Sequence, residues 1–69
     1  MQTFALAGKE YIELNKLLKI FNLVETGGEA HVRIDAGLVK VNGAIEMQRR
    51  KKLRSGDVIF YNKVTITIE

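Results

Sequence analysis

Five cations lie within six consecutive residues in the second half of this 69-residue chain. They are Arg49, Arg50, Lys51, Lys52 and Arg54. The net charge of the chain is +3, so subtracting these five charges leaves −2 for all other residues. A solvated face is the ordinary explanation of such a run. Because the charge is local and follows a hairpin pattern, it instead favours a polyphosphate partner. Five phosphate contacts predict that log K falls with log salt at a slope of about −3.5 for single-stranded RNA.

Three other residues extend this candidate surface: His31, Arg33 and Lys40. His31 and Arg33 fall on a predicted helix, from which either side chain could contact RNA. Lys40 falls on a strand that leads into a turn. It could extend the basic surface, or it could equally keep an exposed strand soluble.

Gly27 and Gly28 form a candidate phosphate cradle, because backbone N–H groups at the start of a helix are free to bind an anion. Thr26 and Glu29 could already satisfy those donors, and the charge of Glu29 would repel an anion. A capped structural helix is the favoured interpretation of these residues taken alone.

The residue types needed for most other chemistry are absent from the sequence. The chain has no cysteine and one histidine, so a metal site would need carboxylates around His31. The single serine, Ser55, has no evident base and orienting group, so we expect no enzymatic activity, cofactor or small-molecule substrate. No aromatic residue lies within the basic run. Binding through backbone charge and shape is therefore expected, rather than stacking on bases.

The length predicts a single domain over residues 1–69, with a modest core. No apolar run approaches the roughly 18–20 residues that span a bilayer. The first residues lack the basic start and apolar centre of a signal peptide. We therefore expect a cytoplasmic protein.

Two helices are predicted in the first half of the chain. Between residues 13 and 21 an apolar stripe follows helical spacing, at Leu14, Leu17, Leu18 and Phe21. A second helix is predicted from a capping box at residues 26–29 to a terminating glycine, Gly37. Its body also alternates like a strand, and the two end signals favour the helix.

Strands are predicted over the rest of the chain. Residues 38–41 and 44–46 flank Asn42-Gly43, a strong hairpin signal because both residues tolerate positive φ. Residues 58–61 and 64–68 form two more strands, residues 3–6 a short one, and the basic run a loop or strand extension. The predicted fold is α+β, with two helices packed on a small antiparallel sheet.

Residues 13–43 resemble the RNA-binding domain named after ribosomal small-subunit protein S-four, also called the alpha-L motif. The family pattern matches at Glu13-Leu14-Asn15, Leu17-Leu18, Asn22-Leu23, residues 37–43 (GLVKVNG) and later Gly56-Asp57-Val58. Residues 37–43 are the most specific part. The chain departs from the family at Gly27 and His31, which stand where a basic residue is usual. The chain is similar to small stand-alone bacterial members, which also carry a basic run after the hairpin.

The resemblance implies RNA binding without catalysis. The interface would combine the basic run, the second helix and the hairpin, and the partner would be structured RNA, ribosomal or transfer RNA, and with it the ribosome. The alternative is a small adaptor whose basic face meets an acidic protein. Nuclease treatment of a pull-down separates the two hypotheses.

Overall fold

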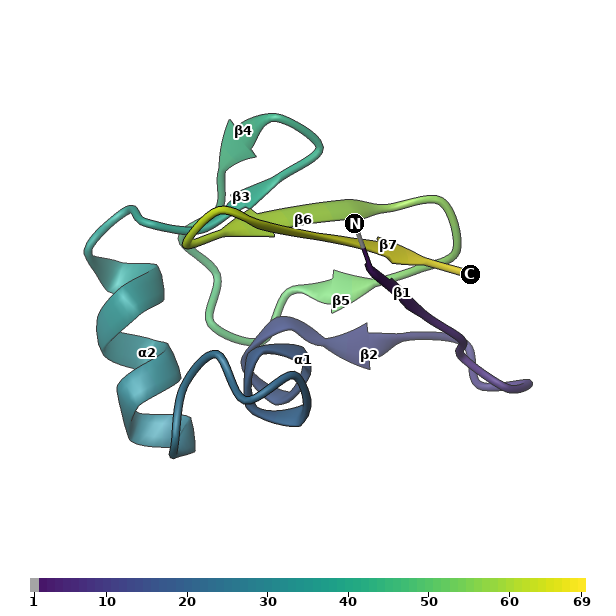
Figure 1. The fold of residues 1–69 in the computed structure, drawn as a ribbon, viewed down its shortest axis with the longest axis horizontal. Coiled ribbons are helices and arrows are strands. Elements are labelled where there is room, and N and C mark those ends of the chain that lie inside the picture. The colour runs from purple at the N-terminus through teal and green to yellow at the C-terminus, as the bar shows by residue number, and fades with distance from the viewer. Residues whose placement is uncertain (1) are drawn as a thin grey trace.

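The computed structural model describes residues 2–69, which form two helices and seven strands (Figure 1). In chain order these are β1 (Gln2–Phe4), β2 (Ile12–Glu13), α1 (Leu14–Ile20), α2 (Gly27–Asp35), β3 (Lys40–Val41), β4 (Ala44–Ile45), β5 (Lys52–Leu53), β6 (Val58–Tyr61) and β7 (Val64–Ile68). The predicted α+β class is confirmed. Neither helix within residues 2–69 has the length and apolar character needed to cross a lipid bilayer.

The main sheet has five strands in the order β1-β7-β6-β3-β4. Four of these strands pair antiparallel, as expected, but β1 pairs parallel with β7, so the sheet is mixed. The backbone N–H of Glu69 donates to the carbonyl of Phe4 (2.8 Å), and that of Leu6 donates to the carbonyl of Glu69 (3.1 Å). These bonds tie the first strand to the last across nearly the whole chain. Parallel strands require a long crossover, and both helices lie within it.

A second sheet contains only β2 and β5, which pair antiparallel. The basic run is predicted from the sequence as a loop or strand extension, and its Lys52–Leu53 part forms β5. The partner strand β2 was not predicted, because two residues are too few to show an alternating pattern.

The α1 stripe is confirmed: Leu14, Leu17 and Leu18 are fully buried. Phe21 lies just beyond the helix and meets Phe4 edge to face, with ring centroids 6.3 Å apart. The helix therefore packs its apolar side against the sheet, as amphipathic spacing requires.

The predicted caps of α2 are also present. The Thr26 hydroxyl accepts a hydrogen bond from the backbone N–H of Glu29 (3.1 Å). The Glu29 carboxylate reaches back one residue further than a standard capping box, to the N–H of Glu25 (2.6 Å). Gly37 follows the helix with a φ of +76°, the left-handed conformation that a glycine adopts without strain.

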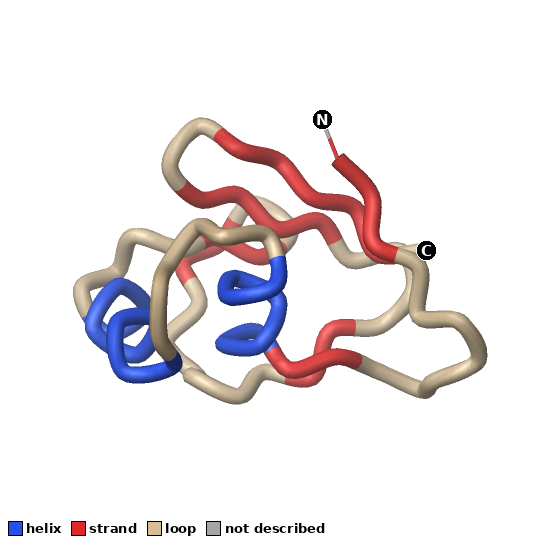
Figure 2. The backbone as a smooth tube through the Cα atoms, turned by 60° about the horizontal axis from the view of Figure 1, so that its bottom comes forward, coloured by secondary structure: helices blue, strands red, loops and turns tan. Residues whose placement is uncertain are grey.

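Both helices and the β2–β5 pair lie on one side of the main sheet (Figure 2). Along β6, Ile59 and Tyr61 are buried beneath them, whereas Val58 and Phe60 are exposed. The core therefore lies between these two layers, and the opposite face of the sheet is open.

Candidate nucleic-acid interface

Residues 49–54, called the basic segment below, contain the five cations and Leu53 and run along the start of α1. The backbone N–H of Leu14 donates to the carbonyl of Lys51 (2.9 Å), and that of Asn15 donates to the carbonyl of Arg49 (3.1 Å). The first N–H groups of a helix have no partner inside it, and Glu13 provides no side-chain cap. Because the basic segment supplies the missing acceptors, its backbone is held in one path.

Strand alternation sorts the side chains of β5. Leu53 is fully buried and pairs in register with Ile12, whereas Lys52 and Arg54 on either side are exposed. Both cations lie over the ring of Tyr11, with Lys52 Nζ 5.0 Å and Arg54 Cζ 5.6 Å from its centroid. Such contacts are cation–π interactions.

Tyr11 was weighed from the sequence as a residue that could stack on bases, but it was not among the predicted RNA-binding residues. The basic run contains no aromatic residue, and only the pairing of β2 with β5 brings this ring from a distant part of the chain. No local pattern in the sequence places this ring beside the basic segment.

Arg49 differs from the other cations of the basic segment because it is tied to α2. Its guanidinium donates to both carboxylate oxygens of Asp35, with Nε 3.1 Å from Oδ1. This bond holds the pKa of the Asp35 carboxyl below its ordinary value, and the same pair raises the pKa of Arg49.

Two ion pairs, Lys16–Glu13 and Arg33–Glu29, lie outside the basic segment. Within residues 2–69, four members of the segment therefore have no ion-pair partner: Arg50, Lys51, Lys52 and Arg54.

The Arg49–Asp35 ion pair should make the stability of the fold depend on pH. Because the pKa of Asp35 is depressed in the folded state, the pair stabilises the fold above the unfolded-state pKa. That stabilisation is lost as pH falls through the lower, folded-state pKa. Arg49→Gln is expected to raise the Asp35 midpoint toward its ordinary value in a carboxyl NMR titration. Arg50→Gln is the matched control and should leave the midpoint unchanged; equal midpoints in wild type and Arg49→Gln would contradict the assignment.

The helix residues of the predicted surface are engaged within the protein. Arg33 Nη2 lies 3.4 Å from Glu29 Oε2, and its buried Nε has no hydrogen-bond partner within residues 2–69. The pKa of Glu29 is lowered, mainly by the hydrogen bond from the N–H of Glu25 and also by Arg33. His31 Nε2 lies 3.2 Å from the side-chain amide nitrogen of Asn15, which joins α2 to α1.

The two glycines of the predicted cradle open α2, with Gly27 half-buried and Gly28 exposed. Neither position is crowded: a Cβ at Gly27 would meet nothing within 4 Å, and one at Gly28 would lie 3.8 Å from Thr26 Oγ1. The carboxylate of Glu29 stands in the same helical turn. The cradle stays a prediction.

The structure does not bring Lys40 to the basic segment. Lys40 pairs in register with Ile45 and Phe60, and all three are exposed on the open face of the main sheet. The basic segment lies on the other side, with the helices (Figure 1). Among residues 2–69, no three histidine, cysteine or acidic side chains are grouped so that they could hold a metal ion.

The chain is similar to known proteins over nearly its whole length. The family model described as the S4 domain matches residues 4–69. "Putative RNA-binding protein YbcJ" of Escherichia coli strain K12 is 38% identical over 61 residues, which cover 88% of this chain and 87% of that protein. "Uncharacterized protein YbcJ" of Shigella flexneri matches with the same figures.

A solved structure is similar as well. The solution structure of YbcJ from E. coli, described as revealing an alphaL motif involved in RNA-binding, has a TM-score of 0.73 and 34% sequence identity. The match covers 99% of this chain and 86% of that one. The resemblance seen in residues 13–43 is thereby confirmed. The chain belongs to the S4 domain family.

Proposed function

We propose that residues 1–69 act as a single, non-catalytic domain that binds structured RNA in the cytoplasm, ribosomal or transfer RNA, through the basic segment. Membership of the S4 domain family and the similarity to YbcJ, named as an RNA-binding protein, support this proposal. One observation carries it: four cations that have no ion-pair partner among residues 2–69 project from a backbone that α1 and β2 hold in place.

The fixed backbone of the basic segment should lower the entropic cost of binding RNA. A flexible run of lysines and arginines loses conformational freedom when it binds, and part of the electrostatic gain is spent on that ordering. Here β5 pairing and the two hydrogen bonds to α1 order the segment before RNA arrives. Its charges can then meet the phosphates of a preformed RNA surface, whose shape and backbone are recognised rather than its base sequence.

The salt dependence of binding tests this proposal. Arg49 is occupied by Asp35, so four phosphate contacts are expected rather than five. Each contact contributes a slope of about 0.7 to 0.9, so log K should fall with log salt at roughly −2.8 to −3.6. Fluorescence anisotropy with a purified transfer RNA, between about 50 and 200 mM salt, measures this slope. A salt-independent affinity would contradict the proposal.

A protein partner remains the alternative occupant of the basic segment. Capture of partners from a lysate with and without nuclease distinguishes the two. Loss of the captured material after nuclease treatment supports RNA, whereas acidic proteins that stay bound support the adaptor.

A further inference from the structure

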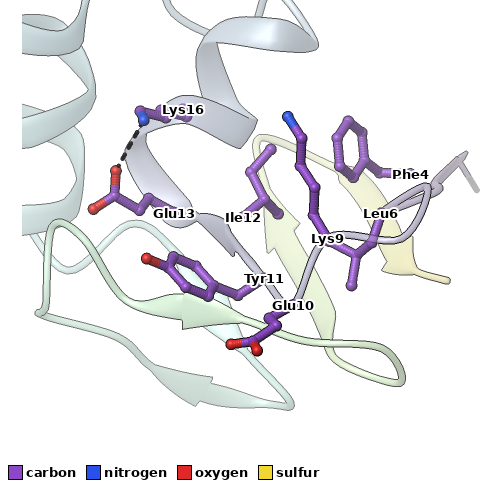
Figure 3. A pocket seen from close by; sticks show the side chains of 8 residues that line it. All are labelled: Phe4, Leu6, Lys9, Glu10, Tyr11, Ile12, Glu13 and Lys16. Atoms are coloured by element: carbon purple, nitrogen blue, oxygen red, sulfur yellow. Dashed lines mark ion pairs between the residues drawn. The ribbon is translucent and has the colours of Figure 1, made fainter.

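A hollow of about 480 Å³ opens beside β2, between the N-terminal loop and the start of α1 (Figure 3). Small-molecule sites typically measure roughly 300–1,000 Å³, so the space suits a ligand of that class. Phe4, Leu6 and Ile12 form its apolar wall. All three also pack in or against the hydrophobic core, so this wall is preformed.

The charges around the hollow are mixed. Lys9 and Lys16 contribute cations, while Glu10 and Glu13 contribute carboxylates. Lys16 Nζ lies 3.2 Å from Glu13 Oε1, and its side chain is otherwise largely exposed (Figure 3). Two carboxylates repel a phosphate group, but they can accept hydrogen bonds from the amino groups of a nucleobase. The arrangement therefore favours an uncharged, planar, partly apolar group inside, with its phosphates outside the hollow.

Tyr11 connects this hollow to the basic segment. It lines the hollow, and Lys52 and Arg54 lie over its ring. An RNA strand whose phosphates lie on those two cations therefore passes the mouth of the hollow. Aromatic residues and apolar walls are the surfaces on which unpaired bases stack.

We propose that the hollow receives one unpaired nucleobase of the RNA that the basic segment holds. The inference rests on the proposed RNA binding and adds a site to it. The base stacks on the ring of Tyr11 at the mouth of the hollow, with its amino edge toward Glu10 or Glu13 on either side of that ring (Figure 3). The adjoining phosphates lie on Lys52 and Arg54.

The test compares two RNA hairpins with identical stems and one bulged nucleotide. In the second hairpin this nucleotide is abasic, which keeps every phosphate and removes only the base. Stacking a base on an aromatic side chain is worth about 1–3 kcal/mol, so wild type should prefer the base-containing hairpin by roughly 5- to 150-fold. The salt slope should be the same for both hairpins, because their phosphates are the same.

Two variants link the preference to the hollow. Tyr11→Leu keeps an apolar side chain without the aromatic face and should bring the preference close to one. Tyr11→Phe keeps the ring and should retain the preference. Circular dichroism of both variants establishes that they are folded.

Each other outcome overturns the inference in a recognisable way. Equal, salt-dependent affinity for both hairpins excludes the base site and leaves the proposed function standing. Binding of neither hairpin contradicts the proposed function itself. A free nucleoside monophosphate that binds as tightly as the bulged hairpin, with NMR shifts at Ile12, would make the hollow a site for free nucleotides instead.

Discussion

Alanine at Arg50, Lys51, Lys52 and Arg54 together should lower the affinity for structured RNA several-hundred-fold at about 0.1 M salt. These are the cations of the basic segment without an ion pair within residues 2–69. Four phosphate contacts change log K by about 2.8 for each tenfold change in salt concentration. The affinity that they add is therefore roughly 600-fold larger at 0.1 M salt than at 1 M salt. The fold should survive, because the backbone bonds from Leu14 and Asn15 go to carbonyl groups, which the substitutions keep.

A pair of variants with equal charge loss controls for net charge. Arg50→Ala with Lys52→Ala removes two cations of the basic segment, and should lower the salt slope by about 1.4. Lys19→Ala with Lys63→Ala removes two exposed cations from the end of α1 and the β6–β7 turn, and should leave the slope unchanged. Equal effects of the two pairs would mean that only the overall charge matters.

A competing surface is tested in the same assay. If alanine at Arg33 and Lys40 weakens binding more than alanine in the basic segment, the RNA lies on α2 and the first hairpin strand instead. The geometry argues against this result, since Arg33 is paired with Glu29 and Lys40 projects from the open face of the sheet.

Leu53→Ala should lower the free energy of unfolding by about 2–5 kcal/mol, the usual cost of emptying a fully buried leucine site. For 69 residues the total stability is roughly 3–10 kcal/mol, so this single change removes a large part of it. Leu53 holds β5 to the core between the two cations that lie on Tyr11. Urea denaturation followed by circular dichroism measures the loss.

Leu38→Ala is the matched control, because it makes the same chemical change at a leucine that is 51% exposed. An exposed substitution away from special features usually changes stability by less than about 0.5 kcal/mol. Similar losses for the two variants would show that Leu53 is not buried as the structure places it.

Local chemistry in the sequence was sufficient to predict several of the secondary-structure elements. Asn42-Gly43 predicted the hairpin, and the two residues have φ values of +53° and +86°. The Thr26 cap and Gly37 resolved the ambiguous body of α2 in favour of a helix. These predictions succeeded because capping and turn geometry depend on neighbouring residues alone.

The amino-acid sequence by itself determined the α+β class, the helices, the main hairpins and the location of the positive charge along the chain. Tertiary structure decided which cations are available: it ties Arg49 to Asp35, turns Lys40 to the opposite face and brings Tyr11 under Lys52 and Arg54. Tertiary structure also decided that β1 pairs with β7 and that β2 pairs with β5. These contacts join residues far apart in the sequence, and strands of two or three residues carry no periodic pattern that identifies a partner. Their pairing depends on how the whole core packs, which no local window of sequence contains.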